Sequence, residues 1–134
     1  MQRQLFFIVT AAGEGATGLA LLVAPGAVLK VLLGALQPPA ESLVTARIAG
    51  AALVALALSC WLARNDHSAP SQGGLLLGVL FYDAAATVLL TLSGTGSNMA
   101  GIGLWPAVAL HSVLGVWCLA CLTARSRQSA AKNH

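Results

Sequence analysis

Four stretches of this chain are apolar over a length that lets a helix cross the hydrocarbon core of a bilayer, which takes about 20 residues. They extend approximately over residues 5–24, 43–63, 75–92 and 102–123. Across the chain 57% of the residues are hydrophobic and only 8% are charged, whereas about a quarter are charged in an average soluble protein. The sequence therefore predicts an all-α fold, an integral membrane four-helix bundle with short loops.

The segments outside these stretches are short, so 134 residues leave little chain for a soluble domain. Pro25 and Gly26 end the first stretch, and the segment at 26–36, with Lys30 as its one charge, is too short to span. We expect that segment to lie at the membrane interface. Polar loops at 64–74 and 93–101 and a basic tail at 124–134 complete what we predict to be a single transmembrane domain.

The basic residues are distributed unevenly between the two ends of the predicted bundle. With four spans, one end carries Arg3, Arg64, Arg125, Arg127 and Lys132, and the other carries Lys30 and Arg47. By the positive-inside rule, both termini are expected in the cytoplasm of a bacterial-type plasma (inner) membrane. The net charge of +3 reflects this bias, so we infer contact with anionic lipid and no nucleic-acid partner.

Each predicted span contains one ionisable residue of the set Glu14, Arg47, Asp83 and His111. A carboxylate in the membrane interior costs about 2.5–3.5 kcal/mol on insertion scales, so a chain that carries one is expected to provide a partner. Glu14 also interrupts what could be read as the apolar core of a signal peptide, which favours a retained first span. Four residues are expected to support this network, by helical spacing or adjacency: Thr10, Thr17, Tyr82 and Thr87.

Glu14, Asp83 and His111 each lie about nine or ten residues from the end of a span, so a rise of about 1.5 Å per residue places all three near the midplane. Arg47 lies about one turn from the end of its span and can extend either to the headgroups or inward to a carboxylate. The network is therefore open to two interpretations. It either fixes helix register, or it binds and releases a proton or cation as in transporters.

His111 raises a separate possibility, that of a haem or metal ligand. It is the one histidine inside a span, since His67 is in a loop and His134 is terminal. Glu14, Asp83 and His111 would offer a carboxylate and imidazole site for a divalent ion, but their spacing matches no recognised ligand motif. No cofactor is predicted.

Cysteines and tryptophans are interpreted mainly as structural residues. Three thiols near one membrane level could bind a soft metal, but small apolar interface residues are the simpler interpretation; these are Cys60, Cys118 and Cys121. Three tryptophans near span ends are expected to be interfacial anchors; these are Trp61, Trp105 and Trp117. With no phosphate-binding glycine loop and no nucleophile elbow, no catalytic residues are predicted and the protein is not expected to be an enzyme.

A chain of this size with four spans and a lone acid in the middle of the first resembles the small multidrug resistance transporters. The matching position is Glu14, within AAGEGATG. The resemblance implies that Glu14 exchanges protons for a cationic drug. The chain departs from that family's pattern in carrying Arg47 and Asp83 within other spans, and it has no clear counterpart of the aromatic residues of the family's pocket.

The second stretch is dense in small residues that let helices approach closely; these are Ala46, Gly50, Ala51, Ala52 and Ala55. We therefore predict a small non-enzymatic membrane protein that acts as an accessory or assembly subunit, with itself or other membrane subunits as partners. The first alternative is a proton- or cation-coupled small-molecule transporter that uses Glu14 and Asp83. The second is a haem- or metal-binding membrane subunit that uses His111.

Overall fold

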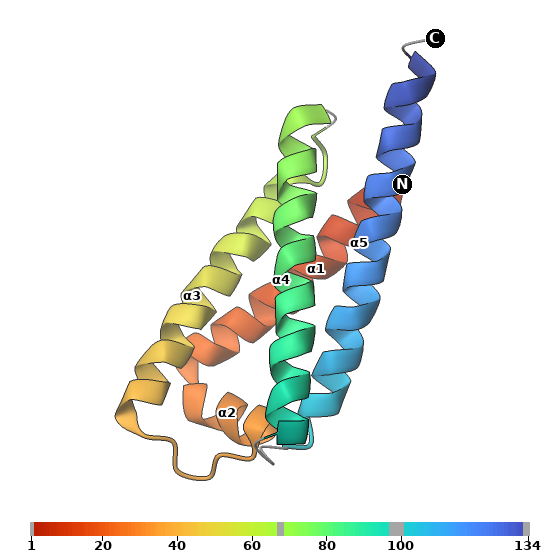
Figure 1. Ribbon diagram of the computed structural model, residues 1–134. Helices are drawn as coiled ribbons and strands as arrows, with labels where there is room; N and C mark the ends of the chain where they lie inside the picture. Colours follow the sequence, from red (N-terminus) through yellow and green to blue (C-terminus); the bar gives the residue numbers. More distant parts are fainter. Residues whose placement is uncertain (1, 67–68, 97–100, 133–134) are drawn as a thin grey trace.

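The chain folds entirely into helices in the computed structural model, which describes residues 2–66, 69–96 and 101–132 (Figure 1). The helices in these ranges are α1 (Gln2–Val23), α2 (Pro25–Leu33), α3 (Ala40–Ala63), α4 (Ala69–Gly96) and α5 (Leu104–Lys132). Among the described residues, four helices are long and apolar enough to cross a membrane, with α2 as the short exception. The predicted fold class, a helical membrane protein with four spans, is confirmed.

The nine-residue helix α2 turns the chain at one end of the bundle. Pro25 starts it, at a position where the missing N–H is not needed. The helix ends at Leu33 and is capped by Gly34, whose left-handed backbone (φ 72°) favours glycine. The Gly34 N–H donates to the Lys30 carbonyl. The segment at 26–36, expected at the membrane interface, therefore contains most of a short helix, which contacts α1, α3 and α5 at this end of the bundle.

The segment that leads into α5 forms backbone hydrogen bonds with α2. The Gly101 and Gly103 N–H groups donate to the carbonyls of Leu32 and Val31, at 3.2 and 2.9 Å. A Cβ atom at Gly101 would collide with the Val31 backbone, so this approach requires a residue without a side chain. The connection therefore fixes the start of α5 against α2.

The long helices form two closely packed pairs, α1 with α3 and α4 with α5. α1 runs obliquely behind α4, with its first half near α5 (Figure 1), and it packs against α3 over much of its length. At the α1–α3 crossing, Gly18 and Gly50 face each other. A Cβ built on either glycine would lie 2.7 Å from the other's carbonyl oxygen, so the crossing depends on two residues that lack side chains.

Apolar side chains form two clusters along the bundle. The larger cluster lies near the N-terminal half of α1 and draws on all four long helices: Phe6, Phe7, Ala11, Cys60, Leu76, Val79, Leu114, Cys118 and Cys121. The smaller cluster joins α1 to α3 through Leu21, Ala46 and Leu53. The middle of α1, which carries Glu14, passes between the two clusters.

The start of α1, the α3–α4 connection and the C-terminal end of α5 lie toward the same end of the bundle (Figure 1). Polar side chains join the start of α1 to the neighbouring ends of α3 and α4: Arg3 Nη1 donates to Gln72 Oε1 at 3.3 Å, and Gln4 Nε2 donates to Asn65 Oδ1 at 3.0 Å. This is the end to which the sequence assigns most basic residues. Its assignment to the cytoplasm stays a prediction from charge.

Three segments expected as loop or tail are more helical than the sequence pattern indicates. α4 begins at Ala69, within the predicted loop at 64–74, and continues to Gly96, within the predicted loop at 93–101. α5 continues to Lys132, through most of the predicted tail. Alanine, arginine, glutamine and lysine in that tail favour helix once a span has nucleated it. Residues 67–68 and 97–100 of the predicted loops, and 133–134 of the tail, lie outside the described residues.

Gly50→Ala is expected to lower the free energy of unfolding by about 1–3 kcal/mol, because the added methyl overpacks the α1–α3 crossing. Gly78→Ala is the matched control, since a Cβ at Gly78 meets nothing within 4 Å. The measurement is unfolding in mixed detergent micelles, followed by circular dichroism. Equal stability of the two variants would contradict the close approach at the crossing.

Candidate functional site

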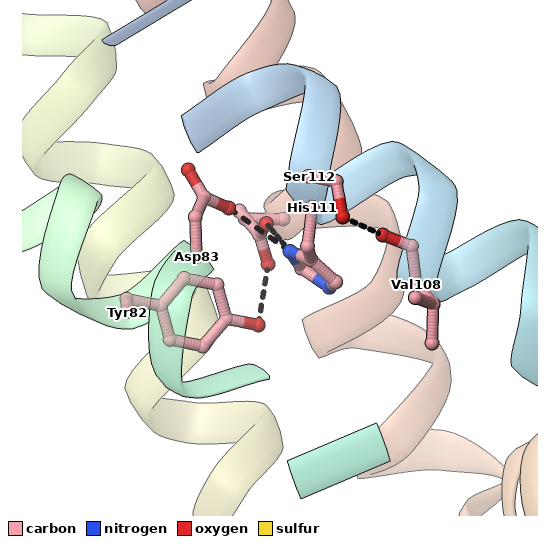
Figure 2. Close-up of polar contacts among 6 residues, drawn as sticks. Tyr82, Asp83, Val108, His111 and Ser112 are labelled. Carbon is pink, nitrogen blue, oxygen red and sulfur yellow. Dashed lines mark hydrogen bonds and ion pairs between the residues drawn. The ribbon is translucent and has the colours of Figure 1, made fainter. Parts of the chain in front are cut away.

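Four polar side chains from three helices meet inside the bundle (Figure 2). α1 supplies Glu14, α4 supplies Tyr82 and Asp83, and α5 supplies His111. Glu14 and Asp83 are buried, with 4% and 1% of their surface exposed. We refer to these four residues as the polar cluster.

Hydrogen bonds and an ion pair connect the polar cluster. His111 Nδ1 lies 2.9 Å from Asp83 Oδ1 and 4.0 Å from Glu14 Oε1. The Tyr82 hydroxyl donates to the other Glu14 oxygen, Oε2, at 3.1 Å. The Tyr82 and His111 rings also form a T-shaped contact, with centroids 5.4 Å apart and planes at 83°. Glu14 is therefore tied to α4 by one oxygen, while its second oxygen faces His111.

The polar cluster is not fully satisfied. Asp83 Oδ2 and, one turn before Glu14 on α1, Thr10 Oγ1 are buried and have no hydrogen-bond partner among the described residues. A buried polar atom without a partner costs about 1–3 kcal/mol, and more if it is charged. Two carboxylates also face a single imidazole, so the cluster would hold a negative charge whenever both acids are ionised.

Local sequence explains how α4 and α5 bring these side chains together. Gly115 follows His111 by one turn on the same face of α5. A Cβ atom at Gly115 would lie 3.6 Å from the Asp83 Cβ, so the two helices are in close contact there. Asp83 consequently lies against α5 and reaches His111 directly.

A groove between α4 and α5 leads from the surface of the bundle to the polar cluster. It has a volume of about 320 Å³. Its polar lining is Asp83, Thr87, His111 and Ser112, and its apolar lining is Leu80, Ala84, Val88, Gly115, Val116 and Leu119. His111, with 13% of its side chain exposed, is the point at which the cluster is reached from outside.

Two of the predicted network residues lie on the exposed surface, away from the polar cluster. Arg47 is exposed on α3, and its Nε donates over 3.4 Å to the Leu22 carbonyl; no ion pair joins it to an acid among the described residues. Thr17 is exposed on α1. Thr87, in contrast, lines the groove, and its carbonyl accepts a hydrogen bond from Thr91 Oγ1 at 2.7 Å.

The three cysteines are buried as free thiols in the larger apolar cluster. Cys118 Sγ donates to the Leu76 carbonyl at 3.1 Å, an interhelical contact. Among the described residues, Glu14, Asp83 and His111 bring three possible metal-ligand atoms close together, and no such group includes one of these thiols. Their contacts are those of small packing residues.

The tryptophans occupy different environments. Trp61 and Trp105 are about half exposed, and the Arg64 guanidinium lies 3.8 Å above the Trp61 ring centroid. Trp117 instead packs by its edge on Phe6, with ring centroids 5.6 Å apart. Trp117 therefore contributes to the larger apolar cluster as well as lying near a span end.

Ser112 is a site residue that the sequence analysis did not single out. Its hydroxyl donates to the Val108 carbonyl at 2.8 Å, as Figure 2 shows, and it lines the groove beside His111. The sequence places Ser112 next to His111, which was the one available indication of its role. Helical periodicity alone does not reveal the groove between α4 and α5 that both residues line.

No protein-family model, curated protein or solved structure matches this chain. The site's chemistry therefore rests on the geometry of the polar cluster and on the groove that leads to it.

The Tyr82–Glu14 hydrogen bond is expected to show a coupling energy of at least about 0.5 kcal/mol in a double-mutant cycle of Tyr82→Phe and Glu14→Leu. The matched cycle of Tyr82→Phe and Thr17→Val should be additive, since Thr17 faces outward on the same helix. Unfolding in mixed micelles supplies the four free energies for each cycle. Additivity in both cycles would show that the contact contributes nothing to helix association.

Proposed function

We propose that this protein is a small non-enzymatic transporter that binds and releases a cation, either a proton or a metal ion, at Glu14, Asp83 and His111. The observation that carries the proposal is the buried Asp83 carboxylate, which has one oxygen on His111 and the other without a partner among the described residues. The proposal includes a bacterial-type plasma membrane with both termini in the cytoplasm.

Charge balance favours cation binding over a purely structural network. A buried ion pair is tolerated when further hydrogen bonds satisfy its remaining atoms. Here two acids share one imidazole, and Asp83 Oδ2 has no described partner. When both acids are ionised, uptake of a cation would reduce the negative charge of the site, so an affinity for cations follows from the charge that its fixed residues leave uncompensated.

The position of the polar cluster between the two helix pairs supports a transport role. Glu14 belongs to the α1–α3 pair, whereas Asp83 and His111 belong to the α4–α5 pair. A cation held by both sides would draw the pairs together, and its release would loosen them. Transporters commonly change access by rocking one helix bundle against another around a site near the midplane.

The test is cation flux into liposomes that contain the purified protein. Dyes inside report pH and metal concentration after inward gradients of H⁺, Na⁺, K⁺, Mg²⁺ or Zn²⁺ are imposed. We expect flux with wild type for at least one cation, and the rate of protein-free liposomes for Glu14→Gln and Asp83→Asn. Glu41→Gln removes an exposed acid outside the site and should keep the wild-type rate.

Wild-type liposomes that match protein-free liposomes for every one of these cations would overturn the transport proposal. Equal flux in wild type and Asp83→Asn would also overturn it. Circular dichroism and gel filtration of each variant separate a lost site from a lost fold.

A second candidate function, an accessory or assembly subunit, is favoured by the outward face of α1. Small residues recur there at helical spacing, and all are exposed: Gly13, Ala16 and Ala20. A Cβ atom at Gly13 would meet nothing within 4 Å. Faces of this kind let a second membrane helix approach closely, from a copy of this chain or another subunit.

Ala16→Leu is expected to shift the protein from oligomer to monomer, because the larger side chain blocks close approach at this face. Leu19→Ala is the control: Leu19 is also exposed on α1, but this change makes the side chain smaller, so it should keep the wild-type assembly. Native mass spectrometry after gentle detergent extraction measures the assembly. Monomeric wild type without other chains would remove the assembly proposal.

A further inference from the structure

We infer that the cation is a divalent transition-metal ion of the Zn²⁺ type, held by Glu14 Oε1, a carboxylate oxygen of Asp83 and His111 Nδ1. This inference rests on the proposed cation site and names its ligand. One ligand atom from each of the three residues can be chosen so that all three lie within 4.8 Å of one another.

The spacing of these atoms suits one small ion. Zn²⁺ binds carboxylate oxygen and imidazole nitrogen at about 2.0–2.2 Å, so neighbouring ligands in a tetrahedral site are about 3.4 Å apart. The observed separations from His111 Nδ1, 2.9 Å to Asp83 Oδ1 and 4.0 Å to Glu14 Oε1, lie on either side of that value. Small side-chain adjustments would bring all three atoms to ligand distance.

Charge selects a divalent ion. Two ionised carboxylates and a neutral imidazole carry two negative charges, which a divalent ion cancels and a monovalent ion does not. A neutral site is what an apolar interior favours. Before the ion binds, the His111–Asp83 pair holds two protons, one between Nδ1 and Asp83 Oδ1 and one on the other ring nitrogen. The ion displaces the first proton, which is released to water, and the imidazole keeps the second, so the bound ion faces two ionised carboxylates and a neutral imidazole.

Donor chemistry selects among divalent ions. Mg²⁺ and Ca²⁺ prefer six or more oxygen ligands, whereas a site that combines imidazole with carboxylates suits Zn²⁺, Co²⁺, Mn²⁺ or Fe²⁺. His111 faces the carboxylates with Nδ1, so a transition metal gains a nitrogen ligand here that an alkaline-earth ion would not use.

The surroundings of the three ligands have features found around metal ligands. The Tyr82 hydroxyl holds Glu14 by Oε2 and leaves Oε1 directed to His111. Such outer hydrogen bonds orient ligating carboxylates. Asp83 Oδ2 is buried without a partner among the described residues. A half-turn about the Cβ–Cγ bond exchanges Oδ2 with Oδ1, so either oxygen can serve as the ligand. The α4–α5 groove, lined by both Asp83 and His111, leaves open space beside two of the three ligands.

The test is equilibrium binding of Co²⁺ and Zn²⁺ to purified protein in detergent, without a histidine tag. His67→Gln and His134→Gln remove the other two histidines in every sample. We expect one Co²⁺ per chain, with visible bands of tetrahedral intensity and without the near-ultraviolet bands of a cobalt–thiolate bond. Zn²⁺ should displace Co²⁺, and excess Mg²⁺ should not.

Asp83→Asn and His111→Gln each remove a ligand and should weaken binding at least about tenfold. Tyr82→Phe removes the hydrogen bond that orients Glu14 and should weaken binding about tenfold. Glu41→Gln should keep the wild-type affinity. Should a site variant fail to fold, wild type alone remains decisive through labelling with a hydrophobic carbodiimide, mapped by mass spectrometry. Zn²⁺ should protect Glu14 from the reagent, and Mg²⁺ should not.

Absence of Co²⁺ and Zn²⁺ binding by wild type, unchanged affinity in a folded Asp83→Asn variant, or thiolate bands would overturn the inference. Flux of protons or Na⁺ without metal binding would overturn it and leave the transport proposal standing. Metal binding without flux of any cation would support it and overturn the transport proposal, so the two failures are distinguishable.

Discussion

The burial of two carboxylates in the apolar interior is the constraint on which this structure depends. On insertion scales each costs about 2.5–3.5 kcal/mol at a membrane midplane, so Glu14 and Asp83 need partners from other helices. The Tyr82 hydroxyl and the His111 ring provide them. These contacts join α1 to α4 and α5 at the level where the two closely packed helix pairs would otherwise meet through apolar groups alone.

The apolar packing places the polar cluster without using it as the main attachment. The larger apolar cluster already holds all four long helices at one end of the bundle. The Gly18–Gly50 crossing and the smaller cluster hold α1 to α3 at the other. α1 therefore takes part in both apolar clusters, and Glu14 lies on the part of α1 between them. Packing fixes the helices, and the polar cluster occupies the junction that results.

Depth along a span could be predicted from the sequence, whereas the direction in which a side chain points could be predicted only in part. Glu14, Asp83 and His111 were expected near one level, and the structure brings them together with Tyr82. Thr17 was included on helical spacing and Arg47 as the ionisable residue of its span, yet both side chains are exposed. The face that a helix buries depends on the helices beside it, and the low amphipathicity of membrane spans hides that face from periodicity. The oblique path of α1 and the groove between α4 and α5 arise from tertiary packing, which spacing along one helix does not encode.

Comparison of the polar cluster with the larger apolar cluster bears on what the buried acids do. Apolar residues of similar volume often replace buried ion pairs without loss of stability, and one end of this bundle is in fact held by aromatic, aliphatic and thiol side chains. Helix association alone therefore does not require two acids and a histidine at the centre. A network that served only to fix register would be expected to satisfy its own atoms, but Asp83 Oδ2 has no described partner. Two acids around one imidazole, the orphaned carboxylate oxygen and the groove at His111 occur at one site, and together they favour a site that takes up a cation over one that only joins helices.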